Sequence, residues 1–108
     1  MTKLLAYRKN HRKPAILYVN AKWCGYCKTT RPEMEKAAAT LGSVVPVYDM
    51  DADRNQEDVE QLKGVSGYPT ILYVDATGKT TVYPGERTGK DLADWACAKS
   101  GNCARSSR

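Results

Sequence analysis

Residues 21–32 read AKWCGYCKTTRP, and this stretch decides the fold. It follows AILYVNA (15–21), a short run of apolar and β-forming residues that predicts a buried strand. From about Cys24 the pattern becomes helical, because apolar residues recur at positions i, i+3, i+4 and i+7: Met34, Ala37, Ala38 and Leu41. The two cysteines of the stretch, Cys24 and Cys27, therefore lie where a strand passes into a helix.

This junction suits a pair of redox-active thiols. The first turn of a helix carries unpaired N–H groups and the positive end of the helix dipole, and both stabilise a thiolate. We therefore expect Cys24, at the exposed end, to be the nucleophile with a lowered pKa, with the positive charge of Lys28 nearby. Cys27, one turn further in, is expected to be the buried resolving thiol. A CxxC pair alone also resembles half of a zinc site, so the surrounding sequence has to decide.

The remaining elements follow from the same kinds of pattern. Helices are predicted over residues 3–12, 24–41 and 56–63 and after Thr88, which can cap the last one. Further strands are predicted over residues 44–50, 70–74 and 80–83, the last two forming a hairpin. Strands that alternate with helices predict an α/β fold, a mixed sheet with helices on both faces.

In these motifs the chain resembles the thioredoxin superfamily. The family pattern A-x-W-C-G-x-C-K-x-x-x-P is matched by Ala21, Trp23, Cys24, Gly25, Cys27, Lys28 and Pro32. The segment GVSGYPT (64–70) resembles the second signature of the family, which ends in a cis-proline facing the dithiol. The resemblance therefore implies that Pro69 is this cis-proline and that the backbone of Tyr68 pairs with an extended substrate. Two separated motifs and the element order agree, so a thioredoxin-like fold is expected.

A third segment is similar to protein disulfide isomerase domains. Tyr83 and the run GERT (85–88) resemble a segment of those domains, in which Gly85 would keep the surface beside the dithiol open. The pair between the cysteines, Gly25 and Tyr26, resembles that of bacterial periplasmic disulfide isomerases. This pair hints at an oxidising or isomerising potential.

Three departures from the family pattern stand out. The family places a buried acid six residues before the first cysteine, as proton acceptor for the resolving thiol, and here that position is Tyr18. A phenol ionises near pH ~10, so Tyr18 is a poor base at neutral pH. The aromatic position four before the cysteine is Asn20. The chain before Cys24 is also short, so we expect a four-stranded sheet without the first edge strand, leaving strand 44–50 with an open edge.

The resemblance implies a thiol–disulfide oxidoreductase enzyme that acts on protein disulfides and is recharged by a thiol reductant or a reductase. The dithiol itself carries the chemistry, so no metal, nucleotide or flavin cofactor is implied. The substrate should lie extended across Trp23, Tyr26, Tyr68 and Gly85. Two alternatives stay open: a disulfide donor or isomerase of an oxidising compartment, and a redox-silent binding module on the same fold.

Composition sets the outer limits. With 42% hydrophobic and 27% charged residues, the 108 residues fit one globular domain over 1–108, expected to be monomeric. The net charge of +5 favours acidic partners, yet the basic residues around His11 fit a solvated helix end better than a nucleic-acid site: Arg8, Lys9, Arg12 and Lys13. No apolar run approaches the ~20 residues that span a bilayer, and no secretory signal is visible. We therefore expect no membrane partner and favour the cytoplasm, with the periplasm, endoplasmic reticulum or secretion possible for a chain whose targeting segment was removed.

The other small signals are weaker. Cys97 and Cys103 could form a disulfide that staples the tail to the last helix, or could be two unrelated thiols. A zinc site from all four cysteines would require the last helix to end beside the dithiol, which the expected fold disfavours. The acidic residues of 49–60 have the spacing of a calcium loop, but Arg54 stands where such a loop needs glycine. A solvated acidic turn is the better interpretation.

Overall fold

The computed structural model describes residues 1–3 and 13–101. Its elements, in chain order, are β1 (Thr2–Lys3), β2 (Ala15–Asn20), α2 (Gly25–Leu41), β3 (Val47–Asp51), α3 (Gln56–Glu60), β4 (Thr70–Val74), β5 (Thr80–Val82) and α4 (Gly89–Ser100). Each strand and helix predicted from residue 15 onward is present, although β3 begins only after Pro46 and α3 is shorter than expected. The helix predicted over 3–12 lies outside the described residues, apart from Lys3, which belongs to β1.

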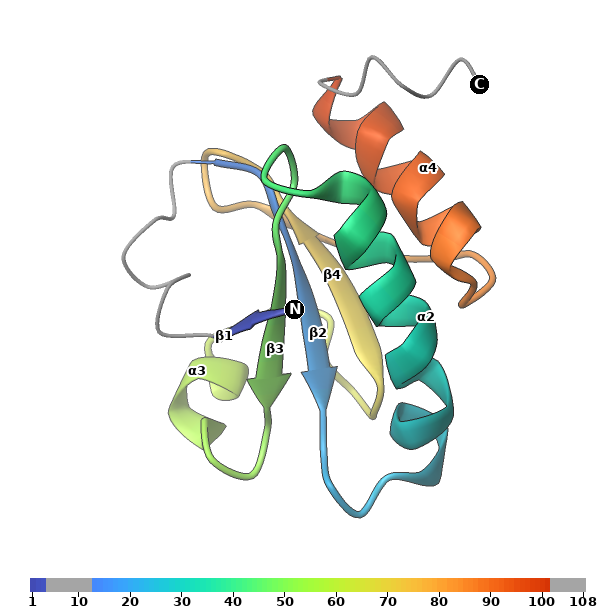
Figure 1. The fold of residues 1–108 in the computed structure, drawn as a ribbon. Helices are drawn as coiled ribbons and strands as arrows, with labels where there is room; N and C mark the ends of the chain where they lie inside the picture. The colour runs from blue at the N-terminus through green and yellow to red at the C-terminus, as the bar shows by residue number, and fades with distance from the viewer. Residues whose placement is uncertain (4–12, 102–108) are drawn as a thin grey trace.

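The strands form one sheet in the order β1-β3-β2-β4-β5 (Figure 1). Strands β2 and β3 are parallel, whereas β4 is antiparallel to β2 and β5 is antiparallel to β4. The predicted mixed sheet of four strands is therefore confirmed for β2 to β5.

The prediction that the sheet lacks a first edge strand was wrong, because a short strand lies at its outer edge. The two-residue β1 pairs in parallel with β3, with Thr2 beside Tyr48 and Lys3 beside Asp49. Two residues are too few to show a period of two in their side chains, so no sequence pattern indicates such a strand. The edge of β3 that was expected to be open is partly covered by β1.

Both faces of the sheet are covered. On one face, α2 and α4 lie side by side and pack on strand residues that alternate with those of the other face: Ile16, Tyr18, Ile71 and Tyr73 (Figure 1). On the opposite face, Leu17, Val19 and Leu72 contact Val59 of α3 and Leu62. All six residues of β2 are buried, which explains why its sequence is a continuous apolar run rather than an alternating one.

The register of the sheet brings two distant segments together. Val19, near the end of β2, pairs with Thr70 at the start of β4. The chain therefore leaves β2 towards Cys24 at the same end of the sheet where Tyr68 and Pro69 enter β4. Tyr68 packs against the buried cluster of Ala21, Cys24 and Cys27.

Helices α2 and α4 approach each other closely at Gly89. A Cβ on this residue would lie 2.7 Å from the Cβ of Lys36 and 3.0 Å from the carbonyl oxygen of Glu33. The Gly89 N–H also donates to Oε1 of Glu33 at 2.8 Å, and this hydrogen bond lowers the pKa of Glu33.

Gly89→Ala should therefore force the two helices apart and lower the free energy of unfolding by about 1–3 kcal/mol. Chemical denaturation measures this loss. The matched control is Gly67→Ala, because a Cβ at Gly67 has no atom within 4 Å. The control should change stability by no more than about 0.5 kcal/mol. Equal losses in the two variants would contradict the close approach at Gly89.

Candidate active site

The two cysteines of the motif form a disulfide at the start of α2. The Cα atoms of Cys24 and Cys27 are 5.2 Å apart. Cys24 is the N-cap of the helix, and its sulfur accepts a hydrogen bond from the backbone N–H of Cys27 at 3.1 Å. The predicted strand-to-helix position of the pair is thus confirmed. Because a free helix N–H points at it, the sulfur of Cys24 is positioned to carry negative charge once the disulfide is reduced.

The two cysteines differ less in exposure than expected. Cys24 is 6% exposed and Cys27 3% in this oxidised state, so both are buried. The exposed surface comes from their neighbours: Trp23 is 69% exposed and Tyr26 76%. Gly25 leaves the space beside the disulfide open, since a Cβ there would meet no atom within 4 Å. Lys28 is exposed in the first turn of α2, which contains no acidic residue.

A second segment completes the site. The peptide bond between Tyr68 and Pro69 is cis, as predicted. The ring of Tyr68 meets that of Trp23 edge-to-face, with centroids 5.8 Å apart and planes at 71°. The indole N–H of Trp23 also donates to Oδ1 of Asp53 at 3.3 Å. Trp23 and Tyr68 therefore form one aromatic surface that joins the cysteine segment to the cis-proline segment.

Arg87 is a part of this site to which the sequence analysis assigned no role. Its Nη2 donates to the carbonyl oxygen of Pro69 at 3.4 Å. Arg87 lines a pocket with Tyr68, Pro69 and Thr70. The signal in the sequence was its place in the run GERT, of which only the glycine was interpreted.

For Gly85 the structure shows a close contact that the sequence analysis did not name. A Cβ on Gly85 would lie 2.7 Å from the hydroxyl of Tyr83 and 3.0 Å from its Cζ. That hydroxyl donates to the carbonyl oxygen of Glu86. Gly85 therefore makes room for the Tyr83 ring, which in turn packs edge-to-face on Trp95. Gly85 is exposed, and its role in keeping the surface beside the dithiol open stays a prediction.

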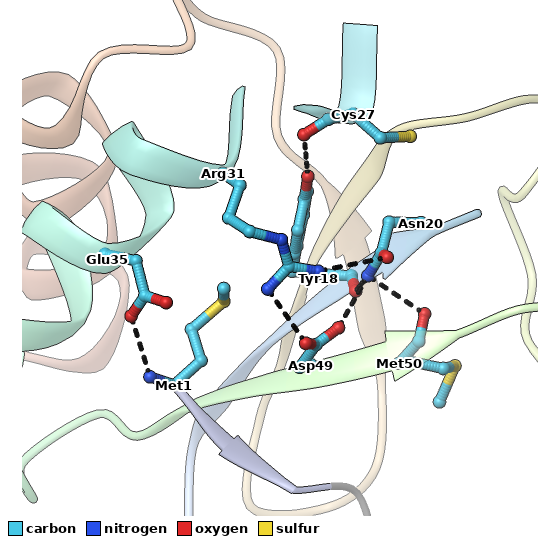
Figure 2. Close-up of polar contacts among 8 residues, drawn as sticks. All are labelled: Met1, Tyr18, Asn20, Cys27, Arg31, Glu35, Asp49 and Met50. Carbon is cyan, nitrogen blue, oxygen red and sulfur yellow. Dashed lines mark hydrogen bonds and ion pairs between the residues drawn. The ribbon is translucent and has the colours of Figure 1, made fainter. Parts of the chain in front are cut away.

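Beneath the disulfide lies the residue that replaces the family's acid. Tyr18 is fully buried, and its hydroxyl donates to the carbonyl oxygen of Cys27 at 2.5 Å (Figure 2). Burial raises the pKa of Tyr18, Arg31 lowers it by less, Asp49 raises it further, and Arg87 has the smallest, lowering effect. Tyr18 therefore stays protonated at neutral pH and cannot accept the proton of Cys27, as we expected for a phenol.

The weaker signals do not converge on a site in the described residues. Within residues 1–3 and 13–101, no group of three or more His, Cys, Asp or Glu side chains is placed to hold a metal ion. In the same part of the chain, none of the helices has the length and apolar character needed to cross a membrane. Cys97 is buried in α4, while its predicted partner Cys103 lies outside the described residues, so their disulfide stays a prediction. Arg8, Lys9, His11 and Arg12 lie outside them as well.

Comparison with known proteins decides the family. The family model described as Thioredoxin matches residues 5–98. This chain belongs to the thioredoxin family. The thioredoxin-like fold expected from the cysteine and cis-proline motifs is therefore confirmed.

Curated relatives of this thioredoxin domain include several protein disulfide-isomerases. The chain is 37% identical over 83 residues to protein disulfide-isomerase of Hordeum vulgare, covering 77% of the chain and 16% of that relative. It is 44% identical over 77 residues to protein disulfide-isomerase A6 of Mesocricetus auratus, covering 70% and 17%. A mitochondrial thioredoxin domain-containing protein of Schizosaccharomyces pombe is 39% identical over 97 residues, covering 78% and 26%. The chain thus spans about a quarter or less of the length of these relatives.

Solved structures show the same fold. The J-Trx1 fragment of ERdj5 superposes with a TM-score of 0.81 at 15% identity, covering 94% of this chain and 52% of that one. The zinc-bound form of human ERp44 superposes with a TM-score of 0.76 at 24% identity, covering 92% and 31%.

Proposed function

We propose that this thioredoxin-family domain is a thiol–disulfide oxidoreductase that exchanges disulfides with protein substrates through Cys24 and Cys27. The observation that carries the proposal is the Cys24–Cys27 disulfide at the N-terminus of α2, next to the aromatic surface of Trp23 and Tyr68. The kinship with protein disulfide-isomerases supports it. The intact cysteine pair argues against a redox-silent binding module.

The proposed reaction has two steps. The thiolate of Cys24 attacks a substrate disulfide, forms a mixed disulfide and releases the other substrate sulfur as a thiolate. Cys27 then attacks the sulfur of Cys24, so that the substrate leaves reduced and the Cys24–Cys27 bond forms again. Run in reverse, the same steps donate a disulfide. The cysteine pair carries both electrons, so the proposal includes no metal, nucleotide or flavin.

Charge and hydrogen bonding support Cys24 as the attacking thiol. The Cys27 N–H lies 3.1 Å from the Cys24 sulfur and can stabilise its thiolate, as can the positive end of the α2 dipole. Cys27 instead lies inside the helix, above the buried ring of Tyr18. We therefore keep Cys24 as the nucleophile and Cys27 as the resolving thiol.

The surface for the substrate is the aromatic one around the disulfide. Trp23 and Tyr26 are large apolar side chains that face solvent, although burying them would be favourable. An extended chain laid across Trp23, Tyr26 and Tyr68 would cover them and reach the backbone beside Pro69. We also propose Gly85 as a part of this surface, since it follows Tyr83, which lines one pocket with Tyr68 and Pro69.

Tyr26→Ala should test this surface, because Tyr26 is exposed and its loss removes contact area with a protein substrate. We expect kcat/KM for insulin to fall about fivefold, equivalent to roughly 1 kcal/mol. The rate with a small aromatic disulfide should stay unchanged, since such a substrate needs only the sulfur. Steady-state assays with the two substrates make the comparison, and an equal loss with both would contradict a docking role for Tyr26.

The function itself is tested by two assays on the unaltered protein. With dithiothreitol as reductant, the domain should accelerate the precipitation of reduced insulin chains. Refolding of scrambled ribonuclease separates the alternative, since an isomerase restores ribonuclease activity whereas a pure reductant only opens the disulfides. No acceleration in either assay would favour the redox-silent module.

We further propose that the domain is a monomer and that a thiol reductant or a reductase recharges it. If the cysteine pair is strongly reducing, we propose the cytoplasm as its compartment.

A further inference from the structure

An acidic residue, Asp49, lies beside Tyr18 on the neighbouring strand rather than on the strand of Tyr18. Tyr18 of β2 and Asp49 of β3 are paired in the parallel ladder. The acid that the family carries on β2 is thus missing, while the position next to it on β3 is acidic. The side chain of Asp49 is 32% exposed, so it is in contact with solvent.

Asp49 belongs to a closed set of three side chains from three elements (Figure 2). Its Oδ2 accepts a hydrogen bond from Nη1 of Arg31 on α2 at 3.0 Å, and its Oδ1 accepts from Nδ2 of Asn20 on β2 at 2.7 Å. Nη2 of Arg31 donates to Oδ1 of Asn20 at 3.3 Å. The pair is a salt bridge, and the hydrogen bond to Asp49 raises the pKa of Arg31. Asn20, which departs from the family's aromatic residue, supplies the link that holds the pair in place.

Two sets of contacts connect these three side chains with Cys27. Arg31 follows Cys27 by four residues in α2, so both lie on the same side of the helix. Arg31, Cys27 and Asn20 line one cleft that is open to solvent. The Cζ of Arg31 also lies 5.5 Å from the centroid of the Tyr18 ring, whose hydroxyl is bonded to the carbonyl oxygen of Cys27.

We propose that the Arg31–Asp49 ion pair, held by Asn20, controls the deprotonation of Cys27, a step for which Tyr18 offers no proton acceptor. Asp49 and Arg31 are positioning residues in this scheme, since they act on Cys27 through their charges and through the water of the cleft. The inference rests on the proposed role of Cys27 as the resolving thiol.

The step at which the pair acts is the release of substrate. Cys27 loses its proton to water in the cleft, and its sulfur attacks the sulfur of Cys24. The Cys24–Cys27 bond forms while the bond between Cys24 and the substrate breaks, and the substrate sulfur leaves with the electron pair. The proton lost by Cys27 ends on this departing thiolate. No further oxidant or reductant is needed.

Other charged and titratable groups line the cleft, pack on Cys27 or act on Arg31 and Tyr18, and their effects have to be separated from that of the pair. Lys22 and Lys28 line the cleft from the loop before α2 and from α2 itself. Arg87 approaches from the chain before α4 through its effect on Tyr18, and Glu35 lies one turn beyond Arg31. Tyr68 packs on Cys27 from the cis-proline segment. Each of these is left unchanged in the variants below.

The test is the titration of Cys27 in the reduced protein, followed by the assigned ¹³Cβ resonance of each cysteine. Asp49→Asn keeps the size of the side chain but leaves the Arg31 cation uncompensated, which favours the thiolate. Arg31→Gln leaves the Asp49 anion uncompensated, which disfavours it. We expect the pKa of Cys27 to fall by about half a unit to one unit in Asp49→Asn and to rise by a similar amount in Arg31→Gln.

Two controls separate this effect from misfolding and from net charge. Asp49→Glu retains the carboxylate and should restore the wild-type titration. Lys36→Gln changes the net charge as Arg31→Gln does, but the exposed Lys36 pairs with Glu33 beside α4 and does not line the cleft, so it should leave Cys27 unchanged. Shifts in the same direction, or no shift in either variant, would overturn the proposal. Because the titration needs no substrate, its failure is distinct from a failure of the insulin assay, which would overturn the proposed function.

Discussion

Cys24→Ser should abolish the reduction of insulin disulfides and leave the fold unchanged. A serine hydroxyl cannot form the mixed disulfide, so the first step of the proposed reaction has no nucleophile. The hydroxyl can still cap α2 by accepting from the N–H of Cys27, which is why we expect no loss of structure. Insulin turbidity measures the activity, and circular dichroism measures the fold.

Cys27→Ser is the matched variant and should fail differently. Cys24 can still attack, but nothing releases the substrate, so a mixed disulfide should accumulate that a non-reducing gel and peptide mapping locate at Cys24. Activity that survives Cys24→Ser, or a complex trapped through Cys27 in that variant, would reverse the roles assigned to the two cysteines.

Tyr18→Asp should destabilise the domain strongly, although it restores the residue type that the family carries at this position. Tyr18 is fully buried between the sheet and α2, and aspartate would leave most of the volume of its ring empty. The new carboxylate would also lie beside Asp49, with Arg31 already engaged. We expect a loss of about 3–5 kcal/mol in the free energy of unfolding.

Tyr18→Phe provides the comparison, because it keeps the ring and removes only the hydroxyl that bonds to the carbonyl oxygen of Cys27. Its cost should be about 1 kcal/mol. Urea denaturation of both variants under oxidising conditions makes the measurement. A Tyr18→Asp domain as stable as the wild type would show that the position tolerates the family's acid and that the tyrosine has no packing role.

The main features of the fold could be predicted from local sequence signals. The apolar run of β2, the helical spacing in α2 and the cap at Thr88 each depend on residues that are near neighbours in the chain. The hydroxyl of Thr88 does accept from the N–H of Asp91 at 3.2 Å. The edge strand β1 could not be predicted, since it consists of one short backbone pairing to β3.

The candidate site also contains residues that the sequence could indicate and contacts that it could not. Trp23, Cys24, Cys27 and Pro69 belong to contiguous motifs, so the sequence indicated them together. The contact between Arg31 and Asp49 joins α2 to β3 and depends on the register of two strands and the rotation of a helix. The sequence named Gly85 for the surface beside the dithiol, whereas its close approach to the Tyr83 ring is known only from the structure.

The most direct test of the whole account is the reduction potential of the Cys24–Cys27 pair, measured in glutathione buffers by mass spectrometry of the peptide that contains both cysteines. A pair that exchanges disulfides should equilibrate between about −270 and −120 mV, the reducing end indicating a reductant and the oxidising end a donor or isomerase. A potential below about −300 mV, the range of structural disulfides, would contradict the account, since the bond would then stabilise the fold rather than react.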